Sequence, residues 1–310
     1  MKKRRIKRSL IRKVIVIIIL IIGVSIFVKT EKYHKTNEYK LKQIGYNKEE
    51  IAVILKEPTE NIEYIKENEY NNQIDDIINE KYYLSKNLKE YIEYKNNNEN
   101  TKLSDVIAII NTHANKEEYK DTFKTDIEKK ELMLVNKYNY LEEDYIPEDV
   151  EPISPMYAYD ENSAPKEVLE HYKEMFYAAK NDGINLIISS SYRSYNEQKE
   201  TYEFYEQIKG DDVKRYASLP GYSEHQTGLA FDILTLGVLT DDFDKTEEYK
   251  WLINNSYKYG FILRYPKEKE NITKFDYESW HFRYVGTEAA QIIHDEKLSF
   301  EEYYAYYIEK

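Results

Sequence analysis

Residues 223–232 read Ser223-Glu224-His225-Gln226-Thr227-Gly228-Leu229-Ala230-Phe231-Asp232. His225 is expected in a turn and Asp232 in the short apolar strand that follows, so the two side chains can bracket one ion. Gly228 lies between them, and a glycine at that point lets the chain turn back closely. The segment therefore predicts a turn that leads into a strand, with a candidate metal site where the two meet.

A second segment reads Tyr277-Glu278-Ser279-Trp280-His281-Phe282-Arg283-Tyr284. Glu278 and His281 are three residues apart, where the chain is expected to enter a strand from a loop. This spacing can place the imidazole on a metal ion and the carboxylate beside the attacking water. A catalytic zinc ion takes three protein ligands from His and Asp or Glu and keeps a fourth position open. Both segments together can supply such a ligand set.

Taken one at a time, these residues have simpler explanations. A single histidine is more often a surface or satisfied core residue than a ligand. Asp232 can be an ordinary acid at a strand end, and Glu278 can be a solvated loop acid. The combination favours a metal site. Four other histidines have no comparable neighbours and are assigned no role: His34, His113, His171 and His294.

The composition narrows the class of protein. The chain has 310 residues and no cysteine, which excludes disulfide scaffolds, cysteine nucleophiles and thiolate metal sites. With 45 Lys and Arg against 57 Asp and Glu, its formal net charge is −12, which argues against a nucleic-acid binder. A transition-metal site in this chain must therefore use histidine and carboxylate.

Alternating strand and helix signals begin near Glu131. Ser194-x-x-Glu197 has the form of a capping box at the start of a helix. Strands are predicted at 184–188, 229–233, 261–265 and 280–285, and helices at 165–182, 194–209, 246–259 and 287–297. This pattern predicts an α+β fold in which helices pack against a small, mainly antiparallel sheet.

The N-terminus has the pattern of a membrane segment. Residues 1–13 carry eight Lys and Arg and no acid, and the fifteen residues from Val14 to Val28 carry no charge. A full span needs about 20 residues, but Lys13 and Lys29 can snorkel. No A-x-A-like cleavage site follows, which favours an uncleaved transmembrane anchor over a removed signal peptide. The positive-inside rule then places residues 1–13 in the cytoplasm and the chain after Lys29 outside.

The apolar periodicity of residues 29–130 predicts short helices with connecting loops. No motif in this region resembles a catalytic or binding site. Asn47-x-x-Glu50 has the form of a capping box, and the polar run 96–101 is typical of a linker. A spacer that holds a catalytic domain away from the membrane is favoured over an auxiliary packing module.

Three motifs in this chain resemble those of the VanY-type D-alanyl-D-alanine carboxypeptidases of the M15 zinc peptidase family. They are Ser190-Ser191-Tyr192-Arg193-Ser194 with Gln198, the segment Ser223 to Asp232, and Glu278-Ser279-Trp280-His281. The resemblance covers roughly residues 130–298. Tyr222, where relatives often carry His, and Ser279, where they often carry Pro, depart from the family pattern, and neither is a ligand position.

The resemblance implies a role for each motif residue. His225, Asp232 and His281 would bind Zn²⁺, and Glu278 would act as general base. Arg193 would stabilise the developing oxyanion, although it can also be a surface guanidinium paired with Glu197. Three residues would contact the substrate: Gln198, Ser223 and Tyr192.

The expected protein is a membrane-anchored zinc carboxypeptidase that removes the terminal D-Ala from peptidoglycan stem peptides. An L,D-carboxypeptidase acting on the tetrapeptide stem is the first alternative. A non-catalytic peptidoglycan-binding module and a lytic endopeptidase are less favoured. The expected organisation is a cytoplasmic tail at 1–13, an anchor at 14–28, a helical region at 29–130, a zinc peptidase domain at 131–298 and a C-terminal helix at 299–310.

The charge asymmetry around residues 14–28 gives a testable topology. Protease added to intact protoplasts should degrade the catalytic domain, because the positive-inside rule places it outside the membrane. Degradation that requires lysed cells would show that the orientation is reversed.

Overall fold

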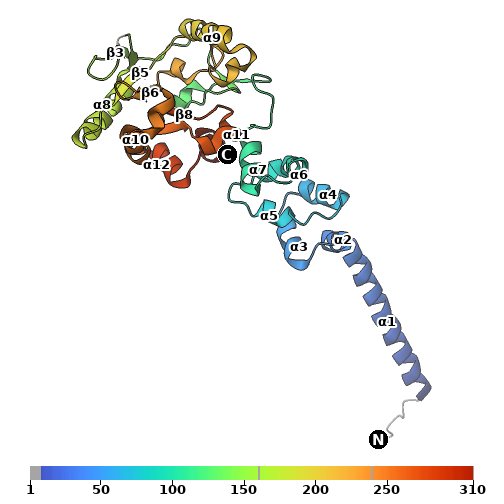
Figure 1. The fold of residues 1–310 in the computed structure, drawn as a ribbon. Coiled ribbons are helices and arrows are strands. Elements are labelled where there is room, and N and C mark those ends of the chain that lie inside the picture. Colours follow the sequence, from blue (N-terminus) through green and yellow to red (C-terminus); the bar gives the residue numbers. More distant parts are fainter. Residues whose placement is uncertain (1–7, 160, 239, 310) are drawn as a thin grey trace. The chain divides into compact units, whose positions relative to one another are not determined.

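The computed structural model describes residues 8–159, 161–238 and 240–309 (Figure 1). The chain divides into two compact units, 1–107 and 108–310, and the boundary lies within helix α7 (Leu103–Asn111). The domain limits expected from the sequence stay predictions.

Helix α1 (Arg8–His34) contains the predicted anchor and is longer than it, with 27 residues. Its part from Arg12 to His34 is long and apolar enough to cross a membrane, and its apolar side chains are exposed. A signal sequence has the same properties. The expected basic tail lies partly in residues 1–7, outside the described residues.

The rest of the first unit consists of short helices, as predicted. Asn47 and Glu50 form both hydrogen bonds of the expected capping box. Leu41, Ile54 and Tyr91 are fully buried, so these helices pack around a small core of their own. The helices are α2 (Asn37–Ile44), α3 (Lys48–Ile54), α4 (Thr59–Glu67), α5 (Ile74–Ile78) and α6 (Leu88–Asn97).

The second unit contains a four-stranded antiparallel sheet in the order β5-β6-β8-β7 (Figure 1). This confirms the predicted α+β fold. The strands are β5 (Ile187–Ser190), β6 (Ala230–Leu234), β7 (Phe261–Tyr265) and β8 (Glu278–Tyr284). Two further strand pairs are β1 (Phe123–Lys124) with β2 (Asn139–Tyr140), and β3 (Val150–Pro152) with β4 (Ser163–Pro165).

The helices of this unit follow the predicted pattern. Ser194 and Glu197 form the expected capping box at the start of α9. The helices are α8 (Lys166–Asn181), α9 (Tyr195–Lys209), α10 (Glu247–Asn255), α11 (Glu270–Thr273), α12 (Thr287–Glu296) and α13 (Phe300–Tyr303).

The two faces of the sheet carry different side chains, mainly apolar on one and more polar on the other. Successive side chains of a strand point to opposite faces. Phe231, Phe261 and Phe282 are fully buried in the apolar core. Tyr172 of α8 packs edge-on against Phe231, with ring centroids 5.6 Å apart. The side chains that alternate with these phenylalanines, among them Asp232 and His281, lie on the opposite face.

Four predicted elements differ in detail. The strand expected at 184–188 is β5, which begins at Ile187 and ends at Ser190. Strand β8 begins at Glu278, because Glu278 pairs with Tyr265, so this acid lies in a strand rather than in a loop. The helix expected at 246–259 is α10 followed by a 3₁₀ turn at Ser256–Tyr259, which ends at the left-handed Gly260. The expected C-terminal helix is α13 followed by a π turn at Tyr304–Ile308.

The turn before β6 requires a glycine, and a substitution there tests this. Gly228 has φ of +71°, and an added Cβ would lie 2.6 Å from Pro165 Cδ. We expect Gly228→Ala to destabilise the second unit by more than about 1–3 kcal/mol, the usual cost of a left-handed non-glycine residue. The urea midpoint, followed by tryptophan fluorescence, reports this unit because both tryptophans, Trp251 and Trp280, lie in it.

Gly237→Ala is the matched control. Gly237 also has a positive φ, +77°, but an added Cβ there meets nothing within 4 Å. Equal midpoints for the two variants would show that the contact with Pro165 does not constrain the turn.

Candidate metal centre

The pairing of β6 with β8 positions two of the predicted ligands. Asp232 lies directly opposite His281 in the antiparallel register. Directly opposite residues project from the same face with Cβ atoms about 4.5–5.5 Å apart. The sheet thus brings together two side chains that are 49 residues apart in the chain.

The third predicted ligand comes from the 3₁₀ turn Glu224–Thr227, which precedes β6. Ser223 caps this turn through its hydroxyl, and Gly228 ends it. His225 Nδ1 lies 2.7 Å from the carbonyl oxygen of Ser191. Since a carbonyl only accepts, Nδ1 carries the proton and Nε2 keeps a free lone pair.

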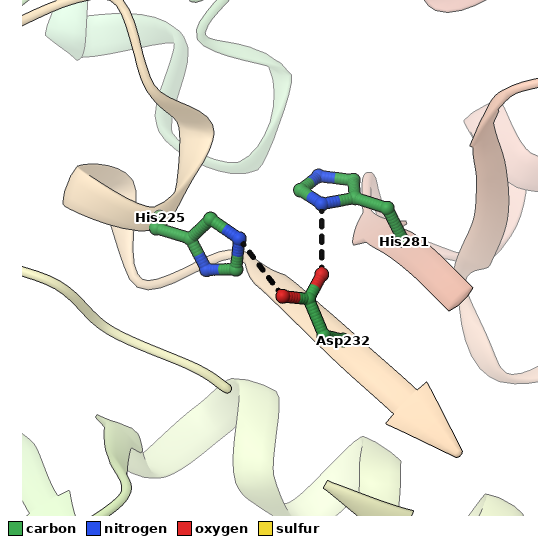
Figure 2. Close-up of side chains that lie close together, drawn as sticks. All are labelled: His225, Asp232 and His281. Carbon is green, nitrogen blue, oxygen red and sulfur yellow. Dashed lines mark hydrogen bonds and ion pairs between the residues drawn. The ribbon is translucent and has the colours of Figure 1, made fainter. Parts of the chain in front are cut away.

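The three side chains converge on one point (Figure 2). His225 Nε2 lies 3.5 Å from one carboxylate oxygen of Asp232, and His281 Nδ1 lies 3.0 Å from the other. One ligand atom from each residue lies within 4.8 Å of the others. The side chains are only 6–16% exposed. Two imidazole nitrogens and one carboxylate oxygen fit a catalytic zinc ion, which needs three protein ligands and an open position.

The pKa values of Asp232 and His281 are shifted in opposite directions. Burial alone would raise the pKa of Asp232, but His225 and His281 beside it hold that pKa well below its usual range. Burial would lower the pKa of His281, yet its hydrogen bonds to Asp232 and Glu224 raise it to about 9. Metal binding would release that proton, because a ligating imidazole is neutral.

Glu278 lies at the start of β8, with its carboxylate 3.7 Å from His281 Nδ1. Burial, opposed by His281 and supported by the charge of Asp232, raises the pKa of Glu278 to about 7. A carboxyl group with this pKa can both accept and return a proton near neutral pH. Asp232 and Glu278 thus share one cleft but differ in charge state, as in sites that divide acid and base roles.

Arg193 lines the same cleft, which has a volume of about 240 Å³. Its guanidinium donates to Gln198 Oε1 at 2.7 Å and to Ser190 Oγ at 2.9 Å. Glu197, the surface partner considered from the sequence, instead caps α9 by accepting from the backbone N–H of Ser194.

The predicted substrate residues lie in different environments. Gln198 is buried, and its amide also donates to the carbonyl of Ser218 at 2.8 Å, so protein groups engage both of its ends. Ser223 and Trp280 line the cleft. Tyr192 is not among the described residues that line it, and its backbone N–H donates to Ser163.

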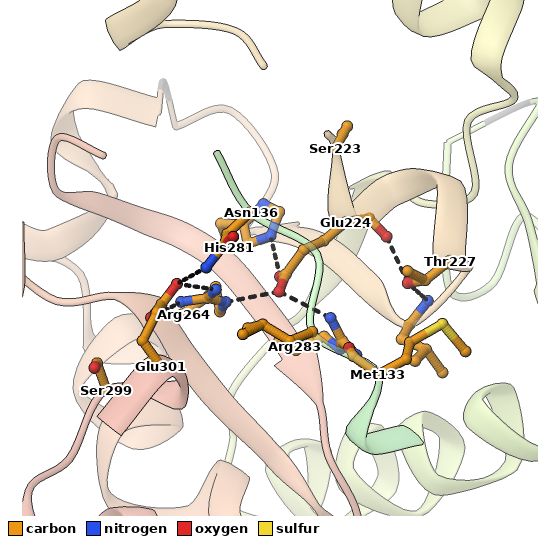
Figure 3. Close-up of polar contacts among 12 residues, drawn as sticks. Met133, Asn136, Ser223, Glu224, Thr227, Arg264, His281, Arg283, Ser299 and Glu301 are labelled. Atoms are coloured by element: carbon orange, nitrogen blue, oxygen red, sulfur yellow. Dashed lines mark hydrogen bonds and ion pairs between the residues drawn. The ribbon is translucent and has the colours of Figure 1, made fainter. Parts of the chain in front are cut away.

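A buried charge cluster behind His281 was not predicted from the sequence (Figure 3). Glu224 contacts both Arg264 and Arg283, and Arg264 also contacts Glu301. Burial would raise the pKa of Glu224, but the two arginines hold it well below its usual range. The available signal was an arginine inside each of two strands: Arg264 in the otherwise apolar or aromatic β7, and Arg283 between the aromatic residues Phe282 and Tyr284 of β8.

Comparison with known proteins identifies the family. A family model described as VanY, D-alanyl-D-alanine carboxypeptidase, matches residues 161–287. The putative carboxypeptidase YodJ of Bacillus subtilis is 44% identical over 181 residues, which cover 56% of this chain and 66% of that protein. The bifunctional D-Ala-D-Ala dipeptidase and carboxypeptidase VanXYC of Enterococcus gallinarum is 33% identical over 181 residues, which cover 94% of its length.

Solved structures agree with this match. The LdcB LD-carboxypeptidase is 40% identical, covers 60% of this chain and 91% of its own, and superposes with a TM-score of 0.56. A structure of the D,D-dipeptidase VanXYg in complex with a D-Ala-D-Ala phosphinate analog is 32% identical, covers 56% of this chain and 69% of its own, and has a TM-score of 0.51. The chain belongs to the VanY family of M15 zinc peptidases, and its His225, Asp232 and His281 form a group that could hold a metal ion. The match with the first curated relative spans slightly less than two thirds of that protein.

Removal of one ligand tests the proposed metal centre. Loss of a residue that only contacts a metal ligand usually weakens metal binding by about 10–100-fold. Because Asp232 is proposed to bind the metal directly, we expect Asp232→Ala to weaken zinc binding by more than that. Bound zinc is measured by competition with a chromogenic chelator. Asp295→Ala is the control, since Asp295 pairs with His294 on the exposed surface. Unchanged zinc affinity in Asp232→Ala would remove this residue from the ligand set.

Proposed function

We propose that this protein is a zinc carboxypeptidase that removes the terminal D-Ala from peptidoglycan stem peptides. The observation that carries the proposal is the convergence of the His225–Asp232–His281 group with Glu278 in a cleft that Arg193 also lines. The family model that matches the chain, D-alanyl-D-alanine carboxypeptidase, supports this proposal.

In this proposal His225, Asp232 and His281 hold the metal. Zinc held by these residues would supply a Lewis acid that lowers the pKa of water to about 7 and polarises a carbonyl. Glu278 accepts the proton of the attacking water and returns it to the leaving amine. Its position beside His281 Nδ1, and its raised pKa, suit this transfer.

Arg193 supplies positive charge where the substrate needs it. The chain is acidic overall, so bulk attraction cannot bring in a C-terminal carboxylate, and a local cation is required. We expect Arg193 also to stabilise the negative charge that develops on the scissile carbonyl, because it lines the same cleft as the proposed metal ligands. Gln198 and Ser190 orient the guanidinium, so we propose that Gln198 acts mainly through Arg193.

Two further residues complete the proposed substrate site. The Ser223 hydroxyl accepts from the His225 backbone N–H at 3.4 Å and keeps its own proton to donate to a substrate. Tyr192 stays a proposal from the motif alone. An L,D-carboxypeptidase that acts on the tetrapeptide stem is the second candidate, supported by the likeness to the LdcB LD-carboxypeptidase.

We also propose that α1 is a single-pass anchor with the N-terminus in the cytoplasm and the catalytic unit outside. Its length and composition support this, since the 23 residues from Arg12 to His34 are long and apolar enough to cross a bilayer, which requires roughly 20. Secretion after cleavage of a signal peptide is the alternative.

The activity and the base are tested together. We expect the protein to release D-Ala from pentapeptide stems, detected by mass analysis. Chelation should abolish this release and added zinc should restore it. Glu278→Gln should lower turnover by about 10²–10⁴-fold, because it removes the proton acceptor and keeps the size of the side chain.

Zinc content distinguishes the base from a ligand. Glu278→Gln should keep its zinc, whereas His281→Ala should lose both zinc and activity. A parental rate in Glu278→Gln would contradict the role of this residue. Cleavage of tetrapeptide stems alone would favour the L,D-carboxypeptidase, and binding of stems without cleavage would favour a non-catalytic module.

A further inference from the structure

A chain of buried charges links the C-terminal helix to the metal centre. From the geometry we infer that Glu224 and Glu301 are positioning residues: Glu224 orients His281 toward the metal, and Glu301 holds Glu224 in place through Arg264. This inference rests on the proposed ligand role of His281.

The first link joins Glu224 to the ligand. His281 presents Nδ1 to Asp232, and its other ring nitrogen, Nε2, lies 3.4 Å from Glu224 Oε2. A carboxylate on the far nitrogen of a ligating imidazole fixes both its tautomer and its ring orientation. Glu224 is in the position to do this for His281.

The second link fixes the Glu224 carboxylate. Arg264 Nε donates to Glu224 Oε1 at 2.7 Å, and an Arg283 NH group donates to the same oxygen at 2.8 Å. Both arginines therefore use one oxygen, and the other is left for His281 (Figure 3). The side chains of all three residues are completely buried.

The third link comes from α13. Glu301 accepts two hydrogen bonds from the guanidinium of Arg264, at 2.6 and 2.8 Å, and its side chain is 3% exposed. This bidentate pairing sets the plane of the guanidinium and hence the direction of its Nε–H. The cluster contains two arginines and two glutamates, so each buried charge has an opposite partner.

Segments outside the part of the chain that the family model matches therefore complete the buried charge cluster. The match covers residues 161–287, whereas Glu301 follows it. On the other side, Arg283 donates to the backbone carbonyls of Glu131 and Met133, which precede the match. In this inference the C-terminal helix is part of the catalytic unit rather than an appendage to it.

The test is a comparison of zinc affinities in the full chain. Glu301→Gln keeps the shape of the side chain but removes its charge, and Glu224→Gln forces an amide NH₂ toward either the arginines or His281. We expect each variant to bind zinc about 10–100-fold more weakly than the parent. Affinity is measured by chelator competition at a temperature where circular dichroism shows the metal-free variants folded.

Glu302→Gln is the matched control. Glu302 lies on the same helix and is equally buried, but it pairs with Lys269 and caps α13 through Ser299. A glutamine can keep the cap, so zinc affinity should stay within about twofold of the parent. Glu224→Gln combined with Glu301→Gln should bind zinc no more weakly than Glu224→Gln alone, because residues that act through one network are non-additive.

The outcomes separate this inference from the proposed function. A parent that binds no zinc refutes the proposed metal centre. A parent that binds zinc, with Glu301→Gln equal to Glu302→Gln, overturns the inference alone, and so do additive losses in the double variant. If Glu301→Gln does not fold, Arg264→Lys replaces it in the comparison of single and double variants. A lysine cannot contact both glutamates as the guanidinium does.

Discussion

The direct pairing of Asp232 with His281 across β6 and β8 is the constraint on which the site depends. An antiparallel register shifted by one residue would move Asp232 to the apolar face, where Phe231 and Phe282 pack against α8. Arg283 lies two residues beyond His281 in β8 and therefore projects from the same face. Core and site thus use opposite faces of one sheet, so a single strand register positions both.

The second feature of the design is the complete burial of four charges behind His281. Removing such groups from water is costly, and an apolar cluster of the same volume would often be at least as stable. We infer that the cluster orients the His281 ring rather than adding to the free energy of unfolding, since each of its hydrogen bonds fixes the direction of a side chain. Glu224 shows this division, with one oxygen on the arginines and the other on the imidazole.

The third feature is the contrast between two carboxylates on neighbouring strands. Asp232 lies between two imidazoles, which hold it ionised despite its burial. For Glu278 the effect of burial is larger than that of the nearby positive charges, and its pKa rises to about 7. Position rather than residue type therefore sets these two pKa values apart, which is consistent with the proposed roles of Asp232 as metal ligand and Glu278 as general base. Arg193 lies in the same cleft, and Gln198 and Ser190 orient it before any substrate arrives.

The sequence by itself determined the local features: the capping boxes at Asn47 and Ser194, the turn at Gly228 and the four strands. These depend on neighbours in the chain. The family resemblance implied the set of His225, Asp232 and His281, and the pairing of β6 with β8 brings Asp232 and His281 together. Only the tertiary structure decided that Glu224 meets Arg264 and Arg283, which are 40 and 59 residues away, and that Glu301 meets Arg264 across 37 residues. No local pattern encodes these pairs, because strand register and the return of the C-terminal helix bring them together.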